Sequence, residues 1–549
     1  MDVLLIAINA KYIHPSPAVR LLKANSALAV EFFEYTLKDS LTDIVADIAK
    51  TNAKMVGLSV YIWNASMMCS LSKAIKDTLN LPVLLGGPEV SHDAAYYLKV
   101  SQADAILCGE GEPDFDLVSR ALIAGAVDTT IPSVTWRDRP CDVPIAYQGK
   151  ADVSTLSSGY DDPLHRLDLA HRIAYVEASR GCPFSCSFCL SSLDQGVRFF
   201  PVDTVLSTLD TLRKAGAKTF KFLDRTFNAS KATQTIIDHI VKTHEHGAVY
   251  QFEITGDMLD PSLIDHIHAV APRGLFRFEV GIQSIHAAVN ARVFRRQDTA
   301  KLFNTLRTLI DHDIVTLHLD LIAGLPGETL SMFAKTFDAT FDLGAKELQL
   351  GVLKLLRGTL LRDQASHYDM VFDARPPYTI KKTAWLSATD LKTIGHIETT
   401  LNLFHNRGLF GSFIYDLFKT TPSPFEAFLS LHATLTAQNI NPHRYQLEDL
   451  YRVLDTWLVA RDMLAAQETL RRVYLLRAKV KPPGYFTFVT HPALTRRVYE
   501  HLASKHGVPL ELFNKHARLI EEAQGYVAVL YQQHKATLYH CSFADCESS

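Results

Sequence analysis

The sequence is short of several features that define whole classes of protein. Its 549 residues include only 8 cysteines, too few for a disulfide scaffold. No uninterrupted apolar run reaches the roughly 18 residues of a membrane-spanning helix. Neither sign of charge predominates, since 56 Lys and Arg face 59 Asp and Glu, so bulk charge does not indicate nucleic-acid binding. We therefore expect a soluble cytoplasmic protein with no membrane among its partners, and the charge balance disfavours nucleic acid as a partner.

Three of the eight cysteines lie close together. Cys182, Cys186 and Cys189 have the spacing C-x3-C-x2-C, directly after a strand-like segment and a Gly-containing turn. Soft thiolates at this density select an iron–sulfur cluster or zinc. Three ligands leave one iron of a cubic cluster open to a small molecule. A structural zinc site would need a fourth ligand, and no His lies between His171 and His239, which disfavours zinc.

Residues 1–136 alternate between strand-like and helix-like segments. Met1–Ala7 is apolar but carries Asp2 where a signal peptide needs positive charge, so we expect a first strand there, at Val3–Ile8. This βαβ rhythm predicts a doubly wound, Rossmann-like parallel sheet whose ligands bind outside the carboxyl ends of its strands. The other strands are expected at Glu31–Thr36, Met55–Tyr61, Pro82–Gly86, Asp104–Cys108 and Ser133–Trp136.

The rest of the chain divides into three predicted parts. Residues 137–170 lack periodicity and are expected to be a linker. Residues 171–365 carry six βα units, too few for a closed eight-stranded barrel, so they predict a partial (β/α)6 TIM-type barrel with its active site at the strand ends. Its strands are expected at Ala174–Arg180, Lys218–Asp224, Tyr250–Gly256, Leu275–Gln283, Val315–Ile322 and Glu347–Leu353. Residues 366–549 predict a mostly α-helical domain, with helical spacing in Ser387–Arg407, Glu448–Ala465 and Leu510–His534.

The cysteine run resembles the signature of the radical SAM superfamily, in which an aromatic residue, here Phe188, precedes the third cysteine. The resemblance implies a [4Fe–4S] cluster on the three cysteines that binds S-adenosylmethionine and cleaves it reductively. It also implies contacts to that molecule from the ends of barrel strands, at Asp224, Glu279, Gln283, Ser284, Ile322 and Gly324. The chain departs from the superfamily pattern at Phe222–Asn228, which replaces a Gly-Gly-Glu stretch, and at Asp320 and Glu328.

The N-terminal domain resembles the cobalamin-binding domain of cobalamin-dependent radical SAM enzymes, in a subgroup with its own C-terminal helical extension. The resemblance implies cobalamin contacts at two strand ends and at a Gly-Glu-Gly-Glu run, from Ser59, Gly86, Gly87, Glu110 and Gly111. The D-x-H-x-x-G motif that supplies a cobalt ligand is replaced by Asn9–His14, so Tyr61 and Trp63 are the candidates to pack against the cofactor. A flavodoxin-like domain without a cofactor is the alternative.

The combined resemblance implies methylation of an unactivated carbon, with an electron donor such as flavodoxin or ferredoxin as partner. Cobalamin-dependent rearrangement or cyclisation is one alternative, and a non-catalytic cobalamin or redox sensor is another. A methylthiotransferase-like enzyme would need a second cluster on Cys69, Cys108 and Cys141. Neither the substrate nor a catalytic residue is readable from the sequence.

Overall fold

The computed structural model describes residues 1–138, 150–166, 168–194, 196–477, 489, 491–533 and 535–547. The chain divides into two compact units, which are described separately below. The first comprises Met1–Thr336 and Gln349–Leu391, and the second comprises Phe337–Leu348 and Lys392–Ser549. None of the helices in the described ranges has the length and apolar character to cross a membrane.

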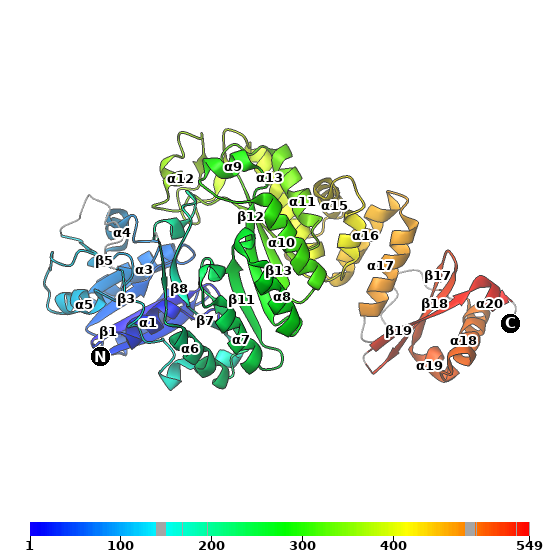
Figure 1. Cartoon of the computed structure of the whole chain (residues 1–549), viewed down its shortest axis with the longest axis horizontal. Coiled ribbons are helices and arrows are strands. Elements are labelled where there is room, and N and C mark those ends of the chain that lie inside the picture. The colour runs from blue at the N-terminus through cyan, green and yellow to red at the C-terminus, as the bar shows by residue number, and fades with distance from the viewer. Residues whose placement is uncertain are drawn as a thin grey trace. The chain divides into compact units, whose positions relative to one another are not determined.

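The first unit begins with a six-stranded sheet, drawn in blue to cyan in Figure 1. Its strand order is β2-β1-β3-β4-β5-β6. The strands are β1 (Val3–Asn9), β2 (Val30–Thr36), β3 (Met55–Ser59), β4 (Val83–Gly86), β5 (Ala105–Leu107) and β6 (Val134–Trp136). All pairs are parallel except β5 with β6. The helices between them are α1 (Pro17–Ala24), α2 (Leu41–Ala49), α3 (Ala65–Leu79), α4 (Ala94–Ser101) and α5 (Phe115–Ile123). The predicted doubly wound sheet is confirmed, and the strand order reverses between β1 and β3, where such sheets bind ligands.

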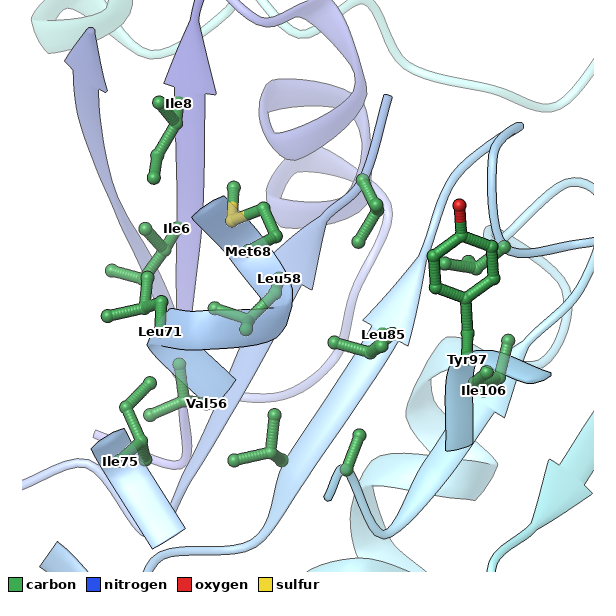
Figure 2. Packing of buried hydrophobic residues seen from close by; sticks show 14 of the residues in the cluster. Ile6, Ile8, Val56, Leu58, Met68, Leu71, Ile75, Leu85, Tyr97 and Ile106 are labelled. Atoms are coloured by element: carbon green, nitrogen blue, oxygen red, sulfur yellow. The ribbon is translucent and has the colours of Figure 1, made fainter. Parts of the chain in front are cut away.

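Alternate residues of the central strands bury opposite faces of this sheet. Figure 2 shows Ile6 and Ile8 of β1 packed with Met68 and Leu71 of α3. Val3, Leu5 and Ala7 belong to the core on the other face, together with residues of α1 and α5. Each fully buried aliphatic side chain contributes about 1.5–3 kcal/mol. Burial on both faces is the reason that the strands read as continuous apolar runs.

The turn after β4 requires glycine. Gly87 has φ +114°, and a Cβ built on it would lie 2.5 Å from the carbonyl oxygen of Val60. We expect Gly87→Ala to lower the free energy of unfolding by about 1–3 kcal/mol, because the new methyl group meets rigid backbone.

Differential scanning calorimetry would measure this loss. Gly395→Ala is the matched control, because Gly395 lies in helix α13 (Ala388–Leu401) with nothing within 4 Å of the added Cβ. That control is expected to be neutral or stabilising by about 0.5–1 kcal/mol. Equal effects of the two substitutions would contradict the steric argument.

A second sheet, in the order β14-β13-β12-β11-β10-β7, forms the predicted partial barrel. Its strands are β7 (Ile173–Val176), β10 (Thr219–Phe222), β11 (Val249–Ile254), β12 (Phe276–Gln283), β13 (Thr316–Ala323) and β14 (Glu347–Val352), with parallel pairing from β7 to β13. The main outer helices are α6 (Val202–Lys214), α7 (Thr233–Thr243), α8 (Pro261–Val270), α10 (Thr299–His312) and α11 (Leu330–Phe341). Buried and half-buried residues alternate along β12 and β13, so one face packs against helices and the other lines the barrel interior.

The predicted first barrel strand, Ala174–Arg180, is split. β7 ends at Val176, and Ser179–Cys182 forms β8, which pairs antiparallel with β9 (Gly196–Phe199). The cysteine run therefore lies on a hairpin rather than on a simple βα loop. The hairpin follows the carboxyl end of β7, where barrel enzymes carry their active sites.

The second unit contains the helices α14 (Phe413–Phe418), α15 (Pro424–Ala437), α16 (Leu447–Val459), α17 (Leu464–Arg477), α18 (Pro492–His506) and α19 (Leu510–His516). A three-stranded antiparallel sheet of β17 (Ala517–Glu522), β18 (Gly525–Gln532) and β19 (Lys535–Ser542) follows. The helix predicted over Leu510–His534 is wrong beyond His516. Gly525 (φ +149°) lies at the turn, and the β-branched and aromatic residues after it favour a strand.

The second compact unit does not begin at residue 366, where the C-terminal domain is predicted to begin. Residues 366–391 belong to the first unit. Tyr378 explains this, because its buried hydroxyl contacts Glu89 and lies 3.2 Å from the hydroxyl of Tyr97, two residues of the N-terminal sheet domain. Of the predicted linker, residues 139–149 and 167 lie outside the described ranges.

Candidate active site

The cysteine loop is held at its base and on both sides. Cys182 ends β8 opposite Gly196, and Gly181 (φ +93°) leaves no room for a side chain against the Gly196 carbonyl. Ser187, between the second and third cysteines, donates its N–H to the carbonyl of Val293 at 2.9 Å. Its own carbonyl accepts from the N–H of Leu361, also at 2.9 Å. The loop is therefore fixed by backbone hydrogen bonds to two other segments.

The three thiols lie near enough to influence one another's pKa. Burial raises the pKa of Cys182 and of Cys186, and a negative charge on Cys189 raises both further. Arg295 opposes this effect at Cys186 through its charge and a hydrogen bond, and Thr226 and Arg225 do so at Cys182. Three soft donors beside cations are the environment in which thiolates bind iron. The donor set therefore fits a [4Fe–4S] cluster with one open iron.

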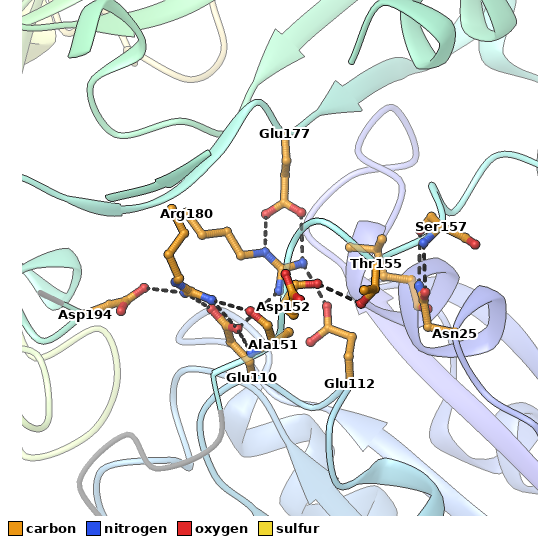
Figure 3. Close-up of polar contacts among 12 residues, drawn as sticks. Asn25, Glu110, Glu112, Ala151, Asp152, Thr155, Ser157, Glu177, Arg180 and Asp194 are labelled. Atoms are coloured by element: carbon orange, nitrogen blue, oxygen red, sulfur yellow. Dashed lines mark hydrogen bonds and ion pairs between the residues drawn. The ribbon is translucent and has the colours of Figure 1, made fainter. Parts of the chain in front are cut away.

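Two arginines of the hairpin join it to the N-terminal domain (Figure 3). Arg180 of β8 lies between the carboxylates of Glu177 (3.0 Å) and Glu112 (2.8 Å). Arg198 of β9 pairs with Glu110 and with Asp194 (3.0 Å). The Gly-Glu-Gly-Glu run thus contacts the cysteine hairpin, a connection that the sequence pattern did not reveal. The predicted cobalamin contact of Glu110 stays a prediction beside this observed role, and Gly111 packs closely against Leu22.

We expect Arg180→Met to cost about 3–5 kcal/mol of stability, because it leaves Glu112 and Glu177 largely buried without their cation. Chemical denaturation would measure the loss. Lys218→Met is the matched control, since its pair with Glu245 is about 40% exposed on both sides and should contribute under about 1 kcal/mol. Similar losses in both variants would contradict the assignment of the network as a structural link.

Asp224 and Glu279, two of the predicted S-adenosylmethionine contacts, already accept hydrogen bonds from neighbouring residues. Asp224 is buried and accepts hydrogen bonds from the N–H of Ala178 (2.9 Å) and the hydroxyl of Ser179 (2.5 Å). Burial raises the pKa of Asp224 to about 7. Glu279 faces the barrel interior, where Lys221 donates to it at 3.0 Å. Both carboxylates therefore organise the walls of the site, and their contact with S-adenosylmethionine remains a proposal.

Two buried polar atoms near the end of β12 have no hydrogen-bond partner among the described residues. Gln283 has φ +62° at an irregularity in the β12–β13 pairing. Ser284 is fully buried and donates to Glu328 Oε1 at 2.6 Å. Among the described residues, Gln283 Oε1 and Glu328 Oε2 have no hydrogen-bond partner. Buried polar atoms of this kind mark a place where a ligand or water supplies the hydrogen-bond partner.

Two predicted positions follow on the neighbouring strand. Ile322 is half-buried on the face of β13 that lines the barrel interior. Gly324 has φ +98°, and a Cβ on it would collide with Ile380. This close approach explains the glycine without invoking a ligand, so its contact with S-adenosylmethionine remains a prediction.

We expect Glu328 to make stability fall as pH rises. Burial raises its pKa from 4.5 to about 8, so the folded chain keeps a proton that the unfolded chain releases between these values. Relative to Glu328→Gln, the wild type should lose on the order of a few kcal/mol between pH 5 and 8. Parallel pH profiles of the unfolding midpoint in the two proteins would contradict this.

The predicted cobalamin-binding residues lie at the carboxyl edge of the first sheet. Ser59 and Gly86 are opposite each other in register. Tyr61 stacks on Trp63 with ring centroids 4.4 Å apart, and Trp63 remains 46% exposed. His14, from the loop where a cobalt-binding His would be sought, instead forms a 2.7 Å hydrogen bond with the hydroxyl of Tyr175 on β7. An exposed aromatic stack beside a Gly-Gly turn fits a flat cofactor.

Two of the cysteines that a methylthiotransferase-like second cluster would need differ from Cys182 and Cys186 in their surroundings. Burial raises the pKa of Cys69 and of Cys108 to about 11, and both thiols pack into the core of the first sheet. Cys141 lies outside the described residues. The contrast with the thiols beside Arg225 and Arg295 favours a single cluster site.

Comparisons with known proteins agree with this geometry. Residues 3–118 match the family model of the B12 binding domain, and residues 176–340 match that of the radical SAM superfamily. Residues 366–534 match a protein family of unknown function, DUF4080.

Three relatives illustrate the likeness. The uncharacterized methyltransferase PH0819 of Pyrococcus horikoshii is 27% identical over 35% of this chain and 44% of its own length. The cobalamin-dependent radical SAM methyltransferase TokK of Streptomyces tokunonensis is 28% identical over 29% of this chain and 23% of its own length. The chain thus spans less than half the length of these curated relatives. The cobalamin-dependent S-adenosylmethionine radical enzyme OxsB, solved with aqua-cobalamin, shares the fold, with a TM-score of 0.60 at 13% identity over 86% of this chain and 84% of its own.

The fold and the matched domains define a protein built around a radical SAM site. More particularly, the chain combines a B12-binding domain with a radical SAM domain, the pair that characterises cobalamin-dependent radical SAM enzymes. This pair implies three cofactors: a [4Fe–4S] cluster, S-adenosylmethionine and cobalamin.

Proposed function

We propose that this protein is a cobalamin-dependent radical SAM methyltransferase that acts on an unactivated carbon of its substrate. The C-x3-C-x2-C run, which begins at Cys182 of a hairpin at the carboxyl end of a parallel barrel strand, carries the proposal. The hairpin is also joined through Arg180 and Arg198 to the domain that matches the B12-binding family. When bound, the cluster with S-adenosylmethionine supplies a carbon-centred radical and cobalamin supplies the methyl group.

The chain's own residues prepare the site. Cys182, Cys186 and Cys189 would hold the cluster, and Arg295 favours the charged form of Cys186. Ser59, Gly86 and the Tyr61–Trp63 stack would hold cobalamin. The partner that such a reaction needs is a one-electron donor such as flavodoxin or ferredoxin. A reducing compartment, and hence the cytoplasm, suits a site made of free thiolates.

Anaerobic reconstitution tests the proposal. We expect the wild type to show iron–sulfur absorbance, to bind cobalamin and to release 5′-deoxyadenosine from S-adenosylmethionine. Alanine at any one of Cys182, Cys186 or Cys189 should reduce 5′-deoxyadenosine formation at least about 100-fold, because each thiolate is a cluster ligand. Cys69→Ala is the matched control and should retain both cluster and activity.

The possible failures separate the alternatives. Wild-type protein that binds both cofactors yet never cleaves S-adenosylmethionine would contradict an enzyme and favour a sensor. Cleavage without cobalamin binding would remove methyl transfer and leave simpler radical SAM chemistry. Transfer of label from methyl-labelled S-adenosylmethionine to a product separates methylation from rearrangement or cyclisation.

A further inference from the structure

We propose that an acidic one-electron carrier protein docks on a basic face beside the cysteine loop, made of Arg292, Phe294, Arg296 and Leu360. The inference rests on the proposed function, because a catalytic cluster of this kind needs a reductant. It goes further by naming the surface and the charge of the partner.

The basic face adjoins the cysteine loop through the backbone. Ser187 lies between Cys186 and Cys189, and its N–H donates to the carbonyl of Val293 at 2.9 Å. Its carbonyl accepts from Leu361 at the same distance. Phe294 and Leu360 are the next residues in sequence to these two contacts, and they are 49% and 44% exposed. A protein docked here would therefore approach the cluster at its binding loop.

The face is positively charged in a chain whose net charge is −3. The side chains of Arg292 and Arg296 are exposed, and that of Arg292 lies over the ring of Trp385. Among the residues that the structure describes, neither arginine forms an ion pair with a carboxylate. The nearby Asp298 caps helix α10 by accepting from the N–H of Lys301. Two unpaired cations attract a partner of negative charge.

Phe294 also occupies an unfavourable backbone conformation. Its φ of +54° is left-handed, which is uncommon for a bulky residue and costs on the order of 1 kcal/mol or more. The conformation leaves an aromatic ring at the surface, where folding gains little from it. An exposed aromatic residue with exposed arginines two positions before and after it in the sequence has the composition of a protein–protein contact.

The test compares an electron-donor protein with a small-molecule reductant. Flavodoxin hydroquinone is the acidic probe, and dithionite reduces the cluster without docking. Stopped-flow loss of iron–sulfur absorbance gives the second-order rate constant on the full chain. We expect Arg292→Glu/Arg296→Glu to lower the flavodoxin rate about tenfold or more at low salt, with a smaller difference at high salt. Phe294→Ala should lower it separately, while dithionite reduces all variants at the wild-type rate.

Arg307→Glu is the control for reversing a charge elsewhere, since it makes the same change of charge as Arg292→Glu alone, half that of the double variant, at an exposed position of α10. Arg295 is left intact because it contacts Cys186. Equal flavodoxin rates in the wild type and the double variant would overturn the proposal, as would a wild type reduced by dithionite but never by flavodoxin. Two other results would also overturn it: the double variant loses self-association of the wild type, or loses binding of a single-stranded RNA oligonucleotide, while its rates with both donors stay unchanged. A cluster that dithionite cannot reduce would instead contradict the proposed function itself.

Discussion

The ion-pair network around Arg180 is the constraint on which the rest of the site depends. β8 and β9 are each four residues long, and a hairpin this short cannot by itself hold three thiols in place. Carboxylates from the Gly-Glu-Gly-Glu run and from Glu177 fix Arg180 two residues before the first cysteine. Partly buried ion pairs add little net stability but are costly to break, so this network specifies placement more than it stabilises the fold. One arginine therefore links the cluster loop to the B12-binding domain.

The two faces of the barrel sheet carry different kinds of residue: apolar side chains on the helix-facing side and polar side chains on the interior side. Phe220, Phe252 and Phe276 are buried on its helix-facing side. The interior side carries paired polar groups. There, Arg277 donates to His318 Nδ1 at 2.8 Å, and because a guanidinium cannot accept, the His318 proton lies on Nε2, 3.3 Å from Asp320. The interior is thus a set of oriented donors and acceptors whose positions are fixed by their pairing.

The same principles explain which predictions succeeded. Both sheets were predictable because apolar or alternating strand segments recur between amphipathic helical segments, with turns at regular intervals, and this leaves a strong periodic signal. The cysteine run was predictable because its ligands are contiguous. The Leu510–His534 segment was not, since short apolar runs suit a helix or a strand until packing decides. Arg180 and Arg198 were overlooked because their partners are up to 88 residues away, and ion pairing at that separation leaves no local pattern.

The sequence by itself determined the donor chemistry of this protein: three thiolates spaced for one cluster, and a glycine-bearing sheet edge ahead of them. These are local properties, fixed by residue type and spacing. Only the tertiary structure decided how they meet. It paired Glu110 and Glu112 with arginines of the cysteine hairpin, bonded His14 to Tyr175, and placed residues 366–391 in the first unit. Charges and hydrogen bonds choose partners by distance in space, which the order of residues does not encode.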